Sequence, residues 1–311
     1  MNTTAKSAAP SAEEGSASLA YALLVMTTLF WSANAIAGKL AVGHVSPMVL
    51  TFLRWAMAFA ILLVIGLPQL RREWTRVRPH LPVLLAYGVT GFAGFNIALY
   101  SALNHTSAIN VTIEQAAIPL LIFIGNFIFF RTRVTALQLV GFSMTFVGVL
   151  FVASNGSLER LAALQFNYGD MLMGVAGVLY AGYSIALRYR PDVHWKTFMI
   201  VMAFSALVTS IPFALWELNS PQGILPDARG WVVAVYTAVF PAILSQIFYI
   251  RGIALIGANR AGLFINLIPV LGTVLAVSIL GEAFGWHHAI AMVLVIGGIT
   301  VAERGKGKTA R

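Results

Sequence analysis

Two stretches of the sequence decide the fold: SALNHTSAINVTIEQAAIP at residues 101–119 and RGIALIGANRAGLFINLIP at residues 251–269. Both combine a short polar turn with a long apolar run, and both place Ile-Pro at the same point of that run. They lie 150 residues apart, and at the same offset Gly148 matches Gly298. The sequence therefore predicts two related halves that are joined in tandem.

The overall composition excludes a soluble enzyme. Of the 311 residues, 59% are hydrophobic and 10% are charged, whereas soluble domains average about 45–50% and about 25%. A chain of this length cannot cover so much apolar surface with a hydrated exterior. Because there is no cysteine, disulfides and thiolate chemistry are excluded as well. The net charge of +9 would allow a nucleic-acid partner, unless membrane topology accounts for the basic residues.

Ten apolar runs are long enough to cross a bilayer as helices, which takes about 20 residues each. They are residues 18–42, 47–67, 80–103, 106–130, 135–153, 169–189, 194–216, 229–255, 259–281 and 286–303. The runs are too long for the strands of a membrane barrel, and they lack the alternation of such strands. The sequence therefore predicts an all-α membrane protein with ten transmembrane helices.

Positive charge falls almost entirely on one side of these predicted spans. With the N-terminus inside, 15 of the 20 Lys and Arg residues lie in cytoplasmic segments, and three lie on the opposite side. The other two, Arg54 and Arg251, fall within spans. Because cytoplasmic loops are enriched in Lys and Arg, both termini are expected in the cytoplasm. The net charge is then an orientation signal, and no nucleic-acid partner is expected.

Each half contains five predicted spans, and this odd number requires the second half to be inverted relative to the first. Inverted repeats are typical of secondary transporters, in which the substrate binds near the midplane between the halves. The predicted organisation is a disordered cytoplasmic tail, a five-helix repeat, a connecting loop, a second five-helix repeat and a basic cytoplasmic tail. These units comprise residues 1–17, 18–153, 154–168, 169–303 and 304–311.

Three further motifs accompany the paired Ile-Pro helices. They are FWSANAIAGKLAV at residues 30–42, LTFLRW at residues 50–55 and LGEAFGWHHAIAMVLVIGGI at residues 280–299. Together these motifs resemble the drug/metabolite transporter superfamily, EamA type, over residues 18–303, and within it bacterial exporters of aromatic and neutral amino acids. The resemblance implies a basket of ten helices in the bacterial inner membrane. Its central cavity would lie between two repeats, with the fifth and tenth helices at the periphery.

Arg54 and Glu114 are the charged side chains that lie deepest in the predicted spans. Each is about 7–8 residues from the outer end of its span, or about 10–12 Å deep, so the two could pair. Such a pair would either fix two helices together or gate the cavity, with Glu114 as a titrating group. Arg251, Lys39 and Glu282 lie close to span ends, from which long side chains can extend to the interface.

A second group of candidates is polar or aromatic but uncharged. Amides within spans can bridge helices or line a wet cavity, and rings beside them would suit a small zwitterion with an apolar side chain. The predicted substrate-binding residues are Trp31, Asn34, Asn96, Tyr100, Gln115, Tyr180, Tyr183, Gln246, Tyr249 and Asn266. Pro119 and Pro269 would interrupt the fourth and ninth helices, either as static kinks or as hinges.

The resemblance and these candidates together predict a carrier that exports small organic solutes, foremost neutral and aromatic amino acids, by alternating access. An exporter of another metabolite or of a cationic drug is the alternative on the same fold, and an intramembrane enzyme or a membrane scaffold is disfavoured. No cofactor, metal site or catalytic residue is expected, because the sequence has no H-E-x-x-H, no phosphate-binding loop and no G-x-S-x-G. The expected partners are a small-molecule substrate and the lipid bilayer, with monomer and homodimer both open.

Overall fold

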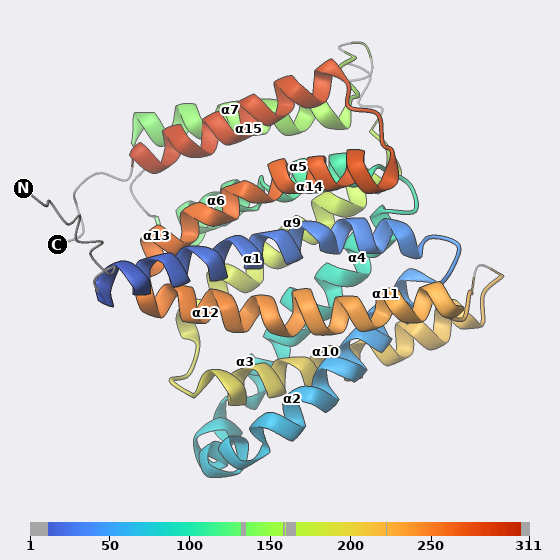
Figure 1. The fold of residues 1–311 in the computed structure, drawn as a ribbon, viewed down its shortest axis with the longest axis vertical. Coiled ribbons are helices and arrows are strands. Elements are labelled where there is room, and N and C mark those ends of the chain that lie inside the picture. The colour runs from blue at the N-terminus through green and yellow to red at the C-terminus, as the bar shows by residue number, and fades with distance from the viewer. Residues whose placement is uncertain (1–11, 132–134, 158, 160–165, 222, 306–311) are drawn as a thin grey trace, which may run out of the picture.

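The computed structural model describes residues 12–131, 135–157, 159, 166–221 and 223–305, and the regular structure in these ranges is entirely helical. The first half contains α1 (Ala12–Ala41), α2 (Pro47–Val77), the 3₁₀ turn η1 (Arg78–His80), α3 (Leu81–Tyr87), the π-helix η2 (Gly88–Gly94), α4 (Phe95–Ala102), α5 (Ala108–Gln115), α6 (Ile118–Phe130) and α7 (Ala136–Ala153). Figure 1 shows these helices side by side with those of the second half.

The second half begins after the connecting segment, of which residues 158 and 160–165 lie outside the described residues. It contains α9 (Tyr168–Ala186), η3 (Leu187–Tyr189), α10 (Trp195–Leu218), α11 (Ala228–Val239), the π-helix η4 (Phe240–Leu244), α12 (Ser245–Ile256), α13 (Ala258–Leu263), η5 (Phe264–Leu267), α14 (Ile268–Leu275), the π-helix η6 (Ala276–Leu280) and α15 (Trp286–Arg304). α1 begins and α15 ends on the same side of the molecule, at the left of Figure 1.

Within the described residues, nine helical stretches are long and apolar enough to cross a membrane, compared with the ten predicted. The difference arises in one stretch, Pro47–Ala102, whose 56 residues contain two predicted spans, 47–67 and 80–103. A straight helix of that length would measure about 84 Å, far more than the hydrocarbon thickness of about 30 Å. Since α4 packs against α2, the chain folds back within this stretch.

The predicted N-terminal tail is shorter than expected, because α1 already begins at Ala12 rather than at residue 18. Residues 1–11 of that tail, and residues 306–311 of the basic C-terminal tail, lie outside the described residues. Most other helices begin and end within a few residues of the predicted boundaries, but α2 continues to Val77, well beyond the predicted end at residue 67. Their starts follow capping side chains: Ser107 Oγ, for example, accepts a hydrogen bond from the Asn110 N–H at 3.0 Å.

The helix irregularities repeat with the same 150-residue offset as the sequence. α6 begins at Ile118 and α14 at Ile268, and in both helices the following proline occupies the first turn after a break. The π-helix η2 in the first half likewise has its counterpart in η4 of the second. π-Helical turns inside longer helices often occur at functional sites.

α7 and α15, the fifth and tenth predicted spans, form a separate pair at one edge of the bundle, as the family resemblance implies (Figure 1). Glycines allow their backbones to approach closely. A Cβ atom on Gly298 would lie 2.4 Å from the carbonyl oxygen of Gly141, and one on Gly141 would lie 2.3 Å from the Gly298 oxygen. Close approach at small residues is a common basis of helix association in membranes.

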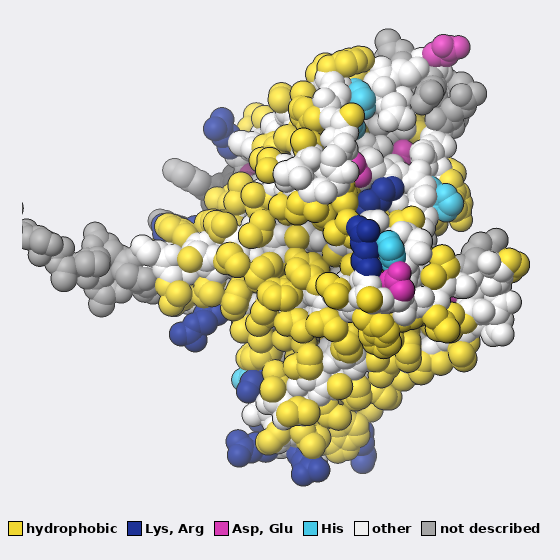
Figure 2. Space-filling view, turned by 45° about the vertical axis from the view of Figure 1, so that its right-hand side comes forward, with side chains coloured by type: hydrophobic (Ala, Val, Ile, Leu, Met, Phe, Trp, Pro, Cys, Tyr) yellow, Lys and Arg dark blue, Asp and Glu magenta, His cyan; other side chains and the backbone are white. Residues whose placement is uncertain are grey.

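The remaining helices pack around two clusters of buried apolar side chains. One cluster contains Leu99 and Ile109, the other contains Leu62 and Met202, and the Tyr180 side chain packs against both. The outer surface is also apolar: Figure 2 shows hydrophobic side chains across the middle of one face, with Lys and Arg mainly at its edges. An exposed apolar surface of this extent is expected where helices contact lipid.

Candidate functional site

Three of the predicted site residues meet in a buried hydrogen-bonded group, which we call the Arg54 trio (Arg54, Asn34 and Tyr100). Arg54 Nη1 on α2 donates to Asn34 Oδ1 on α1 at 2.7 Å and to the Tyr100 hydroxyl on α4 at 2.5 Å. The Tyr100 hydroxyl in turn donates to Asn34 Oδ1 at 2.8 Å. All three side chains are buried, and the Arg54 guanidinium lies 5.1 Å from the centre of the Trp55 ring.

The predicted pairing of Arg54 with Glu114 is wrong. Among the described residues no ion pair involves either side chain, and both carboxylate oxygens of Glu114 lack a hydrogen-bond partner. Arg54 instead uses neutral acceptors from α1 and α4. Equal depth in the membrane is therefore not sufficient, because the two side chains must also face each other around the bundle.

The predicted aromatic residues form two ring pairs, one of which crosses the two halves. The Trp31 ring on α1 lies 5.3 Å from the Tyr249 ring on α12, and Trp31 Nε1 donates to the Pro241 carbonyl oxygen in η4 at 3.3 Å. On α9, Tyr180 lies 5.5 Å from Tyr183. Trp31 is one helical turn before Asn34 of the Arg54 trio, so the rings continue from the polar group along the same face of α1.

Tyr183 is held directly against the π-helix η2. A Cβ atom on Gly91 would lie 2.4 Å from Tyr183 Cγ, so the ring approaches the backbone at a position that only glycine allows. The same ring contacts Tyr87 and Phe92, with centroids 5.9 and 6.1 Å away. The sequence analysis did not identify η2 or Phe92, although glycines at residues 88, 91 and 94 are a visible signal for close backbone approach.

The predicted amides fall into two groups. The Asn96 side chain is used locally, because its Nδ2 donates to the Phe92 carbonyl oxygen at 2.6 Å, immediately after η2. Gln115, Gln246 and Asn266 are half-buried, and their side chains form no hydrogen bond with another described residue. None of the ten predicted binding residues lines the two pockets described below.

Pro119 and Pro269 occupy equivalent places at broken helices but differ in exposure. Pro269 is buried, whereas Pro119 is exposed. The helix preceding Pro119 ends at Gln115, and Glu114 therefore belongs to the last turn before this break. Each proline lies in the first turn of the helix that follows an interruption of the α-helix.

Two carboxylates of the second half cap helices of the first half, which the sequence analysis did not foresee. Glu217, at the end of α10, accepts hydrogen bonds from the N–H groups of Met48 and Val49 at 2.8 and 3.1 Å. Glu282 accepts from the N–H groups of Ala108 and Ile109 at 2.8 and 3.0 Å. A helix N-terminus offers free N–H groups and a favourable dipole to an anion, so these contacts join the halves at one end of the bundle.

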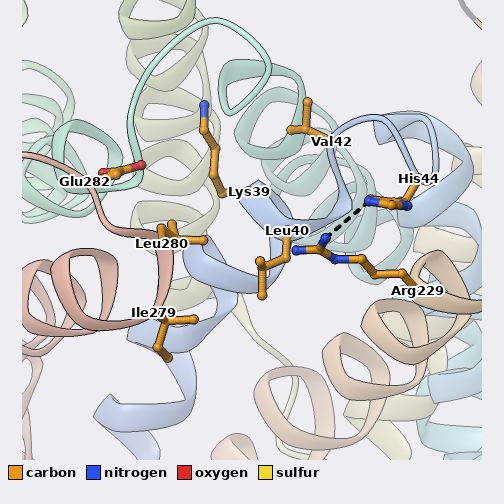
Figure 3. A pocket seen from close by; sticks show the side chains of 8 residues that line it. All are labelled: Lys39, Leu40, Val42, His44, Arg229, Ile279, Leu280 and Glu282. Atoms are coloured by element: carbon orange, nitrogen blue, oxygen red, sulfur yellow. Dashed lines mark hydrogen bonds between the residues drawn. The ribbon is translucent and has the colours of Figure 1, made fainter.

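A pocket of about 340 Å³ opens at the same end, which we call the α1–α2 end because it holds the turn between these helices. Figure 3 shows Lys39, His44 and Arg229 around it, together with Glu282. Lys39 Nζ donates to the carbonyl oxygens of Leu103 and Thr106, so it does not simply extend to the interface as predicted.

His44 connects the two halves at this pocket. Its Nδ1 lies 2.7 Å from Asp227 Oδ2, and its Nε2 lies 3.3 Å from Arg229 Nη1, the contact that is dashed in Figure 3. The hydrogen bond with His44, together with one from the Gly230 N–H, lowers the pKa of the Asp227 carboxyl.

A second, larger pocket of about 830 Å³ lies between α4, α9 and α10, and its walls are mainly apolar. Val89, Leu172 and Phe213 contribute to these walls, and Glu217 lies at its rim with the start of α2. The pocket is separate from the Arg54 trio, none of whose members lines it.

Comparisons with known proteins place this fold in a family. Over 292 residues the chain is 28% identical to the uncharacterized transporter YyaM of Bacillus subtilis, covering 91% of this chain and 93% of that protein. It is 25% identical to the aromatic amino acid exporter YddG of Ancylobacter novellus, covering 88% and 93%. A crystal structure with 25% identity superposes with a TM-score of 0.61 over 92% of this chain and 97% of that one.

The family assignment rests on both halves of the chain. The EamA-like transporter family matches residues 18–154 and again residues 167–303, so the family's unit occurs twice in tandem. These two ranges coincide with the two predicted repeats to within two residues. The chain therefore belongs to the EamA-like transporter family, whose members are membrane transporters rather than enzymes.

Proposed function

We propose that this EamA-family secondary transporter exports neutral and aromatic amino acids across the bacterial inner membrane by alternating access. Ten helices would cross the bilayer as two inverted repeats, with both termini in the cytoplasm and the α1–α2 end outside. The distribution of Lys and Arg supports this orientation. So does the placement of the α1 start and the α15 end on one side of the bundle (Figure 1).

The observation that carries the proposal is the continuity between the Arg54 trio and the ring pairs. Arg54 Nε is buried and has no hydrogen-bond partner, so the guanidinium retains a donor for a substrate carboxylate. One turn away, Trp31 and Tyr249 present ring surface from the two halves. An amino acid with an apolar side chain needs both features within one site.

The substrate's ammonium group needs acceptors, and the amides of the second half can provide them. Gln246 lies one turn before Tyr249 on α12 and is half-buried, as is Asn266 on η5. In this proposal the substrate path is lined by Trp31, Asn34, Asn96, Tyr100, Gln115, Tyr180, Tyr183, Gln246, Tyr249 and Asn266. Pro119 and Pro269 act as hinges at the broken helices, where backbone carbonyls are freed.

The amino-acid assignment also draws on a relative, since the Ancylobacter protein named above is an aromatic amino acid exporter. The test is counterflow of L-[¹⁴C]phenylalanine in proteoliposomes that contain the purified protein. We expect saturable uptake that unlabelled leucine and tryptophan compete for and glutamate does not. Competition by a lipophilic quaternary ammonium compound alone would favour the drug-exporting alternative, and the absence of saturable uptake of phenylalanine would overturn the proposal.

A matched pair of tryptophan variants tests the site itself. Trp31→Ala removes a ring of the proposed site, whereas Trp231→Ala removes a ring that is 48% exposed on α11. Because each lost ring contact contributes about 1 kcal/mol, the KM for phenylalanine should rise about five- to tenfold in Trp31→Ala. The KM of Trp231→Ala should match that of the unmodified protein, and equal values in the two variants would exclude Trp31 from the site.

A further inference from the structure

Four buried oxygen atoms on α5 and α9 have no hydrogen-bond donor. They are Glu114 Oε1 and Oε2, Asn110 Oδ1 and Asp170 Oδ2. The three side chains are only 8%, 4% and 6% exposed. Acceptors that are buried without a donor are costly, and far more so when they carry charge. All four are oxygens that can bind a cation.

Helix spacing and hydrogen bonds connect the side chains of Asn110, Glu114 and Asp170. Asn110 and Glu114 are one turn apart on the same face of α5. The Thr106 hydroxyl donates to Asp170 Oδ1 at 2.5 Å and accepts from Asn110 Nδ2 at 3.2 Å, which joins α5 to the start of α9. α5 packs directly against α9.

The helices around α5 supply no cation to this group. Lys39 on α1 donates its ammonium protons to the carbonyl oxygens of Leu103 and Thr106. His288 on α15 accepts a hydrogen bond from the Gly285 N–H through Nδ1. α14 and α7 carry no titratable side chain. Within the described chain, the only ion pair is that of His44 with Asp227, so Glu114 and Asp170 share no basic partner.

The end of α5 adds to the negative potential. Glu114 and Gln115 form its last turn, and the chain breaks at residues 116–117 before α6 begins. The carbonyl end of a helix carries partial negative charge, and such interrupted helix ends bind coupling cations in other membrane folds. The break therefore favours positive charge beside Glu114.

We propose that Glu114, Asn110 and Asp170 form the coupling-cation site of the transporter, and that its occupant is a proton or Na⁺. This inference rests on the proposed export function and specifies its driving ion. Asp170 and Thr106 lie toward the α1–α2 end, and Glu114 lies about 9 Å farther along the axis of α5 than its first residue. A cation entering from that end passes Asp170 first and then neutralises Glu114.

The coupling follows from electrostatics. With the site empty, two carboxylates share a buried environment, which disfavours close packing of α5 against α9. Binding of one cation removes that repulsion and allows the helices to close. The cation then moves inward as the substrate moves outward, with no covalent step.

The experiment compares gradient-driven transport with counterflow in proteoliposomes, using L-[¹⁴C]phenylalanine. One arm imposes a pH gradient and the other a Na⁺ gradient, so that the two occupants are separated. For the unmodified protein, one of the two gradients should drive phenylalanine accumulation at least fivefold above its equilibrium level. Glu114→Gln should abolish this accumulation while counterflow stays within about twofold, because the neutral amide keeps the shape of a neutralised carboxyl group.

Two further variants are compared: Asp170→Asn changes the second carboxylate of the site, and Asp192→Asn is the control. Asp170→Asn should raise the cation concentration needed for half-maximal accumulation by about tenfold. Asp192→Asn changes a carboxylate that is exposed before α10 and should leave both assays unchanged. Accumulation that persists in Glu114→Gln, or counterflow without response to either gradient in the unmodified protein, would overturn the cation site while leaving export intact. Absence of counterflow in the unmodified protein would instead contradict the proposed function.

A direct binding measurement covers the case in which Glu114→Gln does not fold. If Na⁺ is the occupant, the detergent-solubilised protein should bind ²²Na⁺ saturably, and lowering the pH should displace it. If a proton is the occupant, adding phenylalanine should release protons to a pH-sensitive dye, and ²²Na⁺ should not bind. Neither signal in a protein that is active in counterflow would also refute the proposal.

Discussion

Arg54 Nη1 and Asn34 Oδ1 lie 2.7 Å apart in the buried interior, and this bond links α2 to α1 where the sequence alone had indicated an ion pair. A guanidinium bound by neutral oxygens keeps its positive charge uncompensated by any described carboxylate. Such an arrangement is suited to a site whose ligand itself supplies the negative charge.

The Asn34→Ala variant should be markedly less stable than the unmodified protein. It removes the acceptor shared by Arg54 and Tyr100, which leaves a buried charged group with fewer partners, at a cost of about 1–3 kcal/mol. Thermal unfolding of the detergent-solubilised protein, followed by size-exclusion chromatography, should show a lower midpoint. Asn104→Ala, at an exposed asparagine, should leave the midpoint nearly unchanged.

The Gly298→Ala variant should loosen the pair formed by α7 and α15. The added methyl group would lie 2.4 Å from the Gly141 carbonyl oxygen, so the helices must separate, with a loss of about 1–3 kcal/mol. Gly174→Ala is the matched control, because a Cβ atom there would meet nothing within 4 Å. Thermal midpoints of the two variants should diverge, and equal midpoints would show that the close backbone contact is not needed.

Because of the bond between His44 and Asp227, the stability of the folded protein should depend on pH in the acid range. A carboxyl whose pKa is lowered in the folded protein contributes stability that is fully present above its unfolded pKa, near about 4. That contribution is lost as the pH falls through the lowered folded pKa. Asp227→Asn should therefore lower the thermal midpoint between pH 5 and pH 7, and its deficit should shrink below about pH 4. A deficit that stays constant down to pH 3 would contradict this explanation.

The Glu282→Gln variant should open the α1–α2 end more readily. An amide accepts hydrogen bonds from the Ala108 and Ile109 N–H groups more weakly than a carboxylate and loses the interaction with the helix dipole. The chain has no cysteine, so a single Gln246→Cys change provides a reporter in the interior. A membrane-impermeant thiol reagent added from outside should label it several times faster with Glu282→Gln than with Asp192→Asn, and equal rates would show that this cap does not restrain opening.

The positions of the helices could be predicted from the sequence, because each transmembrane helix satisfies its own backbone hydrogen bonds and needs only a long apolar run. The break before Pro119 and its counterpart before Pro269 were equally visible, since proline removes a backbone donor wherever it stands. The duplication could be predicted for the same reason, because long apolar runs, the Ile-Pro pair and glycines are local features that recur 150 residues later.

The contacts that side chains make with distant parts of the chain could not be predicted from the sequence. Glu282 and Ala108 are 174 residues apart, and only the packed bundle brings that carboxylate to the start of α5. Depth along a helix is set by residue number, whereas the direction in which a side chain points depends on how each helix is rotated against its neighbours. The sequence alone therefore determined the spans, their repeat and the charge bias, and the tertiary structure alone decided that Arg54 binds Asn34 while Glu282 caps the start of α5.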